Sequence, residues 1–490
     1  MRQKSILCVI CLFFTLVLLS CNNTAQDVPK KYYEPTWESL EKYTIPQWYK
    51  DAKFGIFIHW GVYSVPAFAN EWYPRNMYLK DSGVYKYHLE TYGPQKEFGY
   101  KDFIPQFNAE RWDPYHWAEL FKKAGAKYVV PVAEHHDGFA MYNCSHTKWD
   151  AVEMGPRRDI IGDLAGAVRK QGLKFGASYH RAHNWNFFTF DDEFDTVDPE
   201  NSGLYGQRHE PKVPASEEFM EDWLARYIEI IDKYQPDLAW FDFGFNNPEF
   251  EPYRKKLAAY YYNKGQDWVK GVVLNYKNKA FPEEAAVLDI ERGKLNEIRK
   301  LLWQTDTSVC NRSWGYIRNH DYKSVDRLVD ELVDIVSKNG CLLLNICPKP
   351  DGTIPEPQEK ILSDIGRWLE VNGEAIYDTR YWKIYGEGPT KVIEGRFNER
   401  NFKPFTSEDI RFTVKDNNLY AICLVWPGEE INIKSLGLAS DLCPEKITDV
   451  KILGIDQKLK WNRKESGLFI ELPDTKPCDY AYAFRISLEK

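Results

Sequence analysis

Short apolar runs alternate with longer amphipathic stretches from about residue 50 to residue 347. The runs are too short for helices and rich in β-branched or aromatic residues, so they are predicted to be strands at 54–60, 127–133, 174–179, 238–243, 271–275, 286–290 and 341–346. The amphipathic stretches are predicted to be helices at 115–124, 159–171, 217–234, 252–264 and 325–338. This alternation predicts a parallel α/β fold.

Polar residues recur where the predicted strands end. They are His59, Glu134, His135, His136, Asp137, His180, His183, Asp242, Asn275, Lys277, Asp289, Glu291 and Asp306. A single polar residue at a strand end is normally a cap or turn residue. A series of them in chain order favours a (β/α)₈-like TIM barrel, because such barrels build their active sites from the carboxyl ends of several strands.

The pattern changes after about residue 385. A last helix is predicted at 356–372, and short alternating runs then follow at 410–414, 419–425, 431–433, 450–452, 468–472 and 480–486. These runs predict an antiparallel β-sandwich of about 100 residues. We therefore expect a barrel domain at 45–385 and a β-sandwich domain at 386–490.

The first residues have the pattern of a targeting segment. Two basic residues precede an apolar run at 6–19, which is the length of a signal-peptide core and is interrupted only by Thr15. The run leads to Cys21 in a sequence that resembles a bacterial lipobox, although an ordinary signal peptide ending in Cys is the alternative. We expect residues 1–21 to be a lipoprotein signal, Cys21 to carry lipid, and residues 22–44 to be a tether. Asn22, by resemblance to bacterial lipoproteins, favours the outer membrane.

Composition narrows the range of functions. The net charge is −8, which disfavours a nucleic-acid partner because phosphate neutralisation needs a basic surface. No Gly-rich phosphate loop follows an early strand, and no CxxC pair occurs among the seven cysteines that follow Cys21. No cofactor or metal is therefore predicted, and the sequence does not indicate an oligomeric state. Acidic residues and histidines at a barrel mouth, with 15% aromatic residues, favour hydrolysis, and glycoside hydrolysis needs two carboxyl groups.

Seven motifs connect the chain to a known family. They are KFGIFIHWG (53–61), NEWY (70–73), HHDGF (135–139), MGPRRD (154–159), AWFD (239–242), SWGY (313–316) and NGCLLLNI (339–346). In this order they resemble the α-L-fucosidases of glycoside hydrolase family 29. The resemblance implies a somewhat irregular barrel followed by a β-sandwich. It also implies a retaining exo-acting α-L-fucosidase that removes terminal α-L-fucosyl residues from glycans without a cofactor.

The resemblance also implies roles for individual residues. Asp242, two residues after a Trp at a strand end, matches the family nucleophile. Glu291 is the first choice for the acid/base, with Glu283, Glu284, Glu297 and Asp306 as competing carboxylates. The implied substrate-binding residues are His59, Glu71, Trp72, His135, His136, Tyr179, His180, Trp240, Lys277 and Trp314. Lys277 or Asn275 stands where the family often has Arg, and His180 is a substitution in the segment after the third strand.

Two alternatives remain open at this point. The first is a metal-dependent barrel hydrolase in which His135, His136, His180, His183 and Asp242 bind zinc. Adjacent side chains on a strand point in opposite directions, which argues against joint ligation by the His pair. The second alternative is a non-catalytic, glycan-binding lipoprotein.

Overall fold

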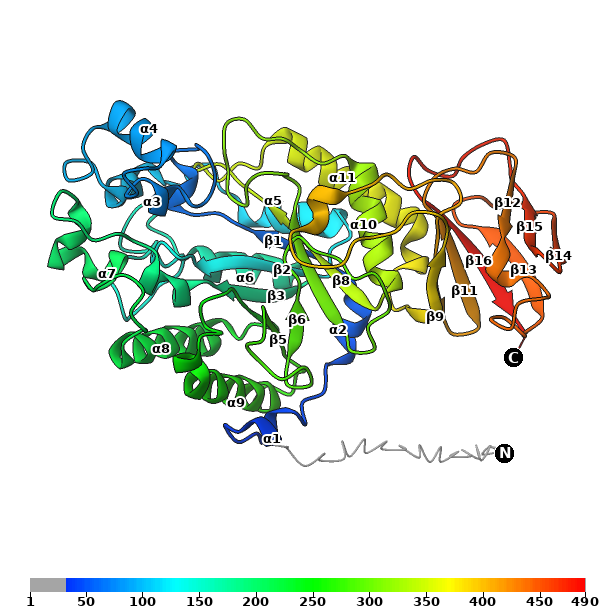
Figure 1. Cartoon of the computed structure of the whole chain (residues 1–490), viewed down its shortest axis with the longest axis horizontal. Coiled ribbons are helices and arrows are strands. Elements are labelled where there is room, and N and C mark those ends of the chain that lie inside the picture. Colours follow the sequence, from blue (N-terminus) through cyan, green and yellow to red (C-terminus); the bar gives the residue numbers. More distant parts are fainter. Residues whose placement is uncertain (1–31, 490) are drawn as a thin grey trace, which may run out of the picture. The chain divides into compact units, whose positions relative to one another are not determined.

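The computed structural model describes residues 32–489 (Figure 1). The predicted signal segment, Cys21 and the first part of the predicted tether lie outside the described residues. Eight parallel strands close into a barrel in chain order. They are β1 (Phe54–Ile58), β2 (Tyr128–Glu134), β3 (Lys174–Tyr179), β4 (Leu238–Phe241), β5 (Val273–Tyr276), β6 (Val287–Asp289), β7 (Trp303–Ser308) and β8 (Gly340–Ile346). The predicted barrel is confirmed.

The helices lie mainly around the outside of this barrel. They are α3 (Tyr73–Asn76), α4 (Gly83–Tyr92), α5 (Pro114–Lys123), α6 (Ile160–Lys170), α7 (Ser202–Tyr205), α8 (Glu217–Tyr234), α9 (Glu251–Asp267), α10 (Val325–Ser337) and α11 (Glu356–Asn372). The described chain has no helix between β5 and β6 or between β6 and β7, so the barrel is irregular there. Among the described residues, no helix combines the length and apolar character needed to cross a bilayer.

Strand β7 was not among the runs predicted from apolar character. Five of its six residues are polar, yet all six are buried. Outward-facing Thr305 donates a hydrogen bond to Ile290 O at 2.6 Å, and inward-facing Gln304 accepts one from Tyr49 Oη at 2.8 Å. Because polar partners replace apolar packing on both faces, a search for hydrophobic runs misses this strand.

The segment at 32–44 is not a tether. It contains helix α1 (Trp37–Leu40) and leads to α2 (Gln47–Ala52). The ring of Tyr43 stacks on Tyr262 of α9 with centroids 4.3 Å apart, and the backbone N–H of Tyr33 donates to Asn263 Oδ1 at 2.7 Å. The expectation of a tether reaching residue 44 was therefore wrong, because aromatic side chains fix this segment to the barrel.

Two antiparallel sheets form the C-terminal sandwich, as predicted. One has the order β13-β16-β11-β10-β9 and the other β12-β15-β14. Their strands are β9 (Arg380–Glu387), β10 (Ile410–Lys415), β11 (Asn418–Cys423), β12 (Glu430–Ile433), β13 (Ile447–Ile452), β14 (Trp461–Lys464), β15 (Gly467–Glu471) and β16 (Tyr482–Leu488). Because β9 pairs with β10, the sandwich begins at Arg380, and the expected boundary at 385/386 falls inside a strand.

A buried ion-pair cluster joins barrel helix α10 to the sandwich. Asp334 on α10 contacts Arg411 Nε on β10 at 2.7 Å and Lys338 Nζ at 2.7 Å. All three side chains are at most 2% exposed. In Figure 1, α10 lies between the barrel strands and the sheet that contains β9 and β11.

Candidate active site

Side chains alternate in direction along each strand, so every second residue points into the barrel, and the functional residues belong to this inward-pointing set. On β4, Leu238 and Trp240 face the interior with the cluster of apolar residues inside the barrel, while Ala239 and Phe241 face the helices. Asp242 continues the inward series one step beyond the strand. Lys277 after β5 and Glu291 after β6 occupy the equivalent positions, so the predicted strand-end residues meet at one mouth.

Asp242 is held by three basic groups. His136 Nε2 and His180 Nδ1 lie 3.2 and 3.1 Å from its Oδ2, and Lys277 Nζ lies 3.3 Å from its Oδ1. Burial by itself raises the pKa of Asp242, but Lys277 and the hydrogen bonds from both histidines hold this pKa well below its usual range. Asp242 Oδ1 accepts no hydrogen bond from the described residues, so a charged oxygen is left for a reaction partner.

His180 supports Asp242 as a neutral ring. Burial is the main cause that lowers the pKa of His180 to about 4, opposed by the hydrogen bond to Asp242. Nδ1–H then donates to Asp242, and Nε2 accepts from Ser178 Oγ at 3.1 Å. The predicted His180 substitution thus belongs to the site.

Lys277 links the carboxylates at the barrel mouth. Its Nζ lies 2.9 Å from Glu291 Oε2 and 3.2 Å from Asp306 Oδ2, in addition to its contact with Asp242. The ammonium also lies 4.7 Å from the centroid of the Trp240 ring. Burial opposes the charge, but Asp242, Asp306 and Glu291 raise the pKa of Lys277 well above its usual value.

A carboxyl pair lies below Lys277. Trp240 Nε1 donates to Asp289 Oδ2 at 3.2 Å, and Gln304 Nε2 also donates to this oxygen. Burial raises the pKa of Asp289, and burial followed by the charge of Asp289 raises the pKa of Asp306 well above its usual value. The buried pair therefore resists carrying two negative charges, and the raised pKa of Asp306 favours protonation of this carboxyl group. Trp240 is part of this floor, buried and edge-to-face with Phe57 at 4.8 Å.

Glu291 has a partner from the C-terminal part of the chain. Arg396 lies in the segment between β9 and β10, and its guanidinium is 3.3 Å from Glu291 Oε2. The N–H of Phe397 donates to the carbonyl of Glu291 at 3.0 Å. Sequence analysis missed this contact because no local signal connects residues so far apart. Of the competing carboxylates, only Asp306 lies at the site, since Glu283, Glu284 and Glu297 are exposed.

The histidine cluster occupies the opposite side of the mouth. His59 donates from Nδ1 to Asn345 Oδ1 at 2.8 Å, and burial lowers the pKa of His59 well below its usual value. His135 is buried, and its Nδ1 has no hydrogen-bond partner in the described part of the chain. Its ring lies 5.8 Å from that of His59 and 4.6 Å from that of His136. Such groups can bind hydroxyls without a charge.

The expectation that adjacent His135 and His136 point in opposite directions was wrong. Both residues lie beyond β2, which ends at Glu134, and the chain turns there, so strand alternation does not apply to them. Both rings therefore lie in the same cluster. At the barrel mouth, two triads of described residues place possible metal ligands within 4.8 Å, namely His59, His135 and His180, and His136, His180 and Asp242. Asp137, in contrast, accepts hydrogen bonds from Tyr100 and the Phe139 N–H.

Glu71 and Trp314 connect two loops at the mouth. Glu71 Oε2 accepts hydrogen bonds from the Trp314 N–H at 2.8 Å and from Ser313 Oγ at 3.2 Å. The Trp314 ring lies 5.1 Å from that of His59. Trp72 beside Glu71 lies 5.5 Å from the His136 ring. These three predicted residues thus surround the histidines.

Tyr179 does not face the site. Its ring packs against Trp223 and Tyr227 of α8, with centroids 5.9 and 5.0 Å away, and its hydroxyl donates to Trp223 O at 3.3 Å. Ser178 and His180 point inward, so strand alternation turns Tyr179 outward. The expected substrate contact of Tyr179 was therefore wrong, and the aromatic residue at this position is a packing residue.

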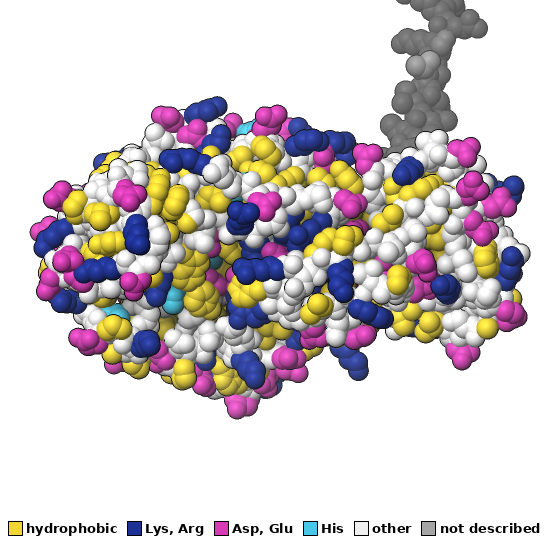
Figure 2. Space-filling model, turned by 45° about the horizontal axis from the view of Figure 1, so that its top comes forward, with side chains coloured by type: hydrophobic (Ala, Val, Ile, Leu, Met, Phe, Trp, Pro, Cys, Tyr) yellow, Lys and Arg dark blue, Asp and Glu magenta, His cyan; other side chains and the backbone are white. Residues whose placement is uncertain are grey.

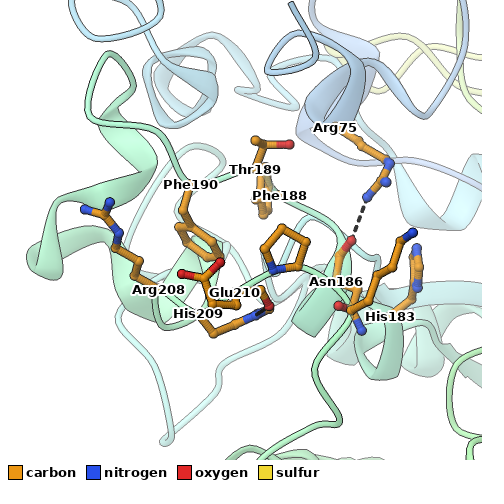
Figure 3. Close-up of a pocket in the computed structure, with 11 residues that line it drawn as sticks. Arg75, His183, Asn186, Phe188, Thr189, Phe190, Arg208, His209 and Glu210 are labelled. Atoms are coloured by element: carbon orange, nitrogen blue, oxygen red, sulfur yellow. Dashed lines mark hydrogen bonds between the residues drawn. The ribbon is translucent and has the colours of Figure 1, made fainter.

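A cavity of about 710 Å³ adjoins the histidines (Figure 3). His183 lines it, and the His183 ring lies 5.1 Å from that of His136. Arg75 donates to the Asn186 carbonyl at 2.6 Å across this cavity, which Figure 3 draws as a dashed line. Arg208, His209 and Lys212 also line the cavity. On the face in Figure 2, acidic and basic side chains are mixed, in line with the modest net charge.

Paired carboxylates and neutral histidines at the mouth of a closed barrel define the class of a barrel glycoside hydrolase. The family model for alpha-L-fucosidase matches residues 19–374, and the model for the alpha-L-fucosidase C-terminal domain matches residues 403–487. The tissue alpha-L-fucosidase of Rattus norvegicus is 32% identical, covering 95% of this chain and 94% of its own length. The plasma alpha-L-fucosidase of Homo sapiens is also 32% identical, with 93% and 92% covered.

A solved structure gives the same result. The alpha-fucosidase of Thermotoga maritima, in complex with a mechanism-based inhibitor, aligns with a TM-score of 0.76 and 34% identity. The alignment covers 93% of this chain and all of that chain. The chain belongs to the α-L-fucosidases of glycoside hydrolase family 29, and the predicted family is confirmed. It is a glycoside hydrolase.

Proposed function

We propose that this α-L-fucosidase is an exo-acting enzyme that works with retention of configuration. The observation that supports retention is the shared contact of Asp242 and Glu291 with Lys277 Nζ, at 3.3 and 2.9 Å. Because one carboxylate oxygen of each residue contacts the same Lys277 nitrogen, these two oxygens lie within about 6 Å of each other. Retaining glycosidases place their carboxyl groups about 5–5.5 Å apart, whereas inverting enzymes need roughly 6.5–9.5 Å to admit a water.

Two displacements make up the proposed reaction. Asp242 Oδ1 attacks the anomeric carbon of an α-L-fucoside and forms a β-linked fucosyl ester, while the proton of Glu291 goes to the leaving oxygen. Glu291 then takes a proton from water, whose oxygen attacks the same carbon and releases α-L-fucose and free Asp242. Arg396 and Lys277 position the Glu291 side chain for both steps.

The remaining mouth residues bind the sugar in this proposal. His59, His135 and His136 exchange hydrogen bonds with ring hydroxyls, and the unpartnered Nδ1 of His135 favours such a ligand. Glu71 and Trp72 close over the sugar from their loop. Trp240, His180 and Trp314 shape the floor and wall and hold the reacting groups. Fucosylated oligosaccharides or glycans are the proposed substrates.

Azide can restore turnover when either carboxylate is removed, and the configuration of the fucosyl azide product distinguishes the roles of Asp242 and Glu291. In Asp242→Gly, azide fills the space of the nucleophile and displaces the leaving group once, so we expect β-L-fucosyl azide from an aryl α-L-fucoside. In Glu291→Ala, azide attacks the fucosyl-enzyme and gives α-L-fucosyl azide after two inversions. Each variant should lose about 10²–10⁴-fold in turnover on a glycosidic linkage without azide.

The matched control is Glu283→Ala, because Glu283 is an exposed competing carboxylate paired with Arg299. It should keep normal turnover. NMR of the first-formed sugar gives a separate readout, which should be the α-anomer for wild type. A first-formed β-anomer would exclude the retaining mechanism, and a β-azide from Glu291→Ala would remove Glu291 as acid/base.

The cavity beside His183 is proposed to hold the sugar unit next to the scissile bond. Arg208 and Lys212 lie on its wall, away from the Asp242 carboxylate. Arg208→Ala should therefore raise KM for a fucosylated oligosaccharide and leave an aryl fucoside unaffected. An equal effect on both substrates would place the second unit elsewhere.

A metal-dependent hydrolase remains the second candidate, because His136, His180 and Asp242 could together hold an ion. In that case a chelator would abolish turnover of an aryl fucoside, and added zinc would restore it. The proposed double displacement predicts full activity after chelation. The two candidates are thus separated by one assay.

We also infer membrane anchoring through Cys21, from the lipobox pattern alone. An acyl chain on Cys21 would hold the enzyme at the bacterial outer membrane while the barrel stays in water. In cells of the source bacterium, Cys21→Ser should lose lipid label and become soluble, with the same turnover per molecule. Continued membrane association of this variant would argue against the anchor.

A further inference from the structure

A second cluster of reactive side chains lies outside the sugar-binding residues, where β7 and β8 end. Cys310 Sγ is 3.8 Å from Cys347 Sγ and 2.7 Å from His320 Nδ1. Both cysteines are buried, and the structure has them as free thiols. The glycosidase chemistry proposed above uses none of these three residues.

The backbone fixes the orientation of the imidazole proton. The Ile317 N–H donates a hydrogen bond to His320 Nε2 at 3.0 Å, so Nε2 is the acceptor of the ring. The ring proton therefore resides on Nδ1 and points at Cys310 Sγ. This tautomer provides a hydrogen bond to a Cys310 thiolate.

The two sulfurs differ in their electrostatic environment. The hydrogen bond from Cys347 is the largest cause that lowers the pKa of Cys310 to about 6, and His320 adds to it against the effect of burial. Burial raises the pKa of Cys347 well above its usual value, so Cys347 stays a thiol. Gln358 Nε2 donates to Cys347 Sγ at 3.3 Å and holds it in place. The cluster thus pairs a thiolate with a thiol.

The strand register allows the two sulfurs to bond. Ser308, the last residue of β7, pairs with Asn345 of β8, and Cys310 and Cys347 each lie two residues further along the chain, just beyond the strand ends. Neighbouring strands lie about 4.8 Å apart, which is inside the range that a disulfide spans between Cα atoms. A cavity of about 550 Å³ lies on the other side of His320, which is one of its lining residues.

We propose that Cys310 and Cys347 are a redox-active pair that a hydroperoxide converts to a disulfide. The Cys310 thiolate attacks the distal peroxide oxygen; the O–O bond breaks, and a proton from solvent completes the leaving water or alcohol. Cys310 is then a sulfenic acid, oxidised by two electrons. The Cys347 sulfur attacks the sulfenic sulfur, its proton leaves with the hydroxyl as water, and the disulfide forms.

Cys144 and Cys341 are matched controls because they are also buried, and burial raises the pKa of each thiol to about 11. At pH 7 the larger thiolate fraction of Cys310, offset by its lower nucleophilicity, should make its oxidation about thirty-fold faster. The reduced full-length protein is treated with hydrogen peroxide, unfolded, alkylated and digested for mass spectrometry. We expect a peptide pair joined through Cys310 and Cys347, reversed by dithiothreitol, while Cys144 and Cys341 stay alkylated.

Two variants test the mechanism. In Cys347→Ser, Cys310 should stop at the sulfenic acid, which dimedone traps, because no second thiol resolves it. In His320→Ala, oxidation of Cys310 should slow at pH 7 and recover at higher pH, whereas His116→Ala, an exposed histidine, should behave as wild type. Oxidation of Cys144, Cys310, Cys341 and Cys347 at one rate would overturn the proposal. So would stoichiometric zinc in the purified protein that protects both thiols, since the pair would then be a metal site.

Discussion

The Lys277 ammonium lies 3.3 Å from Oδ1 of Asp242, and both side chains are buried. Burial destabilises each charge separately, so each residue keeps its charge because the other is present. This pair gives the barrel mouth a carboxylate that stays ionised under acidic conditions. The same lysine also contacts Glu291, so one cation organises both proposed reacting groups.

Replacing Lys277 should shift the acid limb in the pH dependence of kcat/KM. Lys277→Met removes the main influence that lowers the pKa of Asp242, so this pKa rises toward that of a buried carboxyl group. The acid limb of kcat/KM then shifts to higher pH, and turnover at neutral pH falls on the order of 10²-fold. The measurement is the pH dependence of kcat/KM on an aryl fucoside. Lys277→Arg keeps the charge and should leave the acid limb in place. An acid limb that does not shift in Lys277→Met would show that Lys277 does not keep Asp242 ionised.

The carboxyl pair below Lys277 gives a second prediction. The raised pKa of Asp306 predicts that this carboxyl group holds a proton, so Asp306→Asn should preserve its shape and its hydrogen-bonding capacity and keep kcat/KM within about tenfold of wild type. Asp289→Asn instead removes the charged acceptor of Trp240 and Gln304. It should cost about 1–3 kcal/mol of stability. Thermal unfolding and kcat/KM of both variants provide the check, and equal damage in the two would mean that the proton is not on Asp306.

The sequence predicted the site where strand periodicity applies. Asp242, Lys277 and Glu291 each continue the inward series of a strand, so their position at strand ends was sufficient to bring them together. Tyr179 was assigned wrongly because a family resemblance outweighed the same alternation. The expectation for His135 and His136 was wrong for another reason, because β2 ends at Glu134 and both residues lie in the following turn, where strand alternation no longer applies.

Strand β7 and the contact between Arg396 and Glu291 could not be predicted from the sequence, each for its own physical reason. Strand β7 is buried through polar partners, so the search for apolar runs could not find it. Arg396 reaches Glu291 from beyond β9, and only the folded chain brings that segment to the barrel mouth. Pairing of this kind depends on tertiary packing rather than on local propensity.

That long-range contact gives a third prediction. Arg396 is 3.3 Å from Glu291, and its side chain is 40% exposed. Arg396→Ala should lower kcat roughly tenfold on natural glycosidic linkages, where acid catalysis matters most, and change kcat little on nitrophenyl fucoside. Arg400→Ala, an exposed arginine in the same segment, is the control. Loss of activity that is equal on both substrates would indicate general disruption of the segment.

The joint between barrel and sandwich gives a final prediction, on stability. Asp334 lies between Lys338 and Arg411, and removing it in Asp334→Ala leaves two buried cations without a partner, which should cost about 3–5 kcal/mol. Asp364→Ala is the control: its partners Lys360 and Arg367 are 71% and 64% exposed, so the cost should be about 0–1 kcal/mol. Urea unfolding followed by tryptophan fluorescence compares both variants with wild type.

The pKa of Asp334 also predicts how the stability difference between wild type and Asp334→Ala depends on pH. Burial alone would raise the pKa of Asp334, but Lys338 and Arg411 hold this pKa well below its usual range. A carboxyl group with a lowered pKa in the folded state stabilises the protein above its unfolded pKa, about 3.9, and loses that effect as the pH falls toward the folded value. The gap between wild type and Asp334→Ala should therefore stay constant from pH 7 to about pH 5 and narrow only below about pH 4. A gap that closes already near pH 6 would mean that Asp334 is not the stabilising charge at this joint.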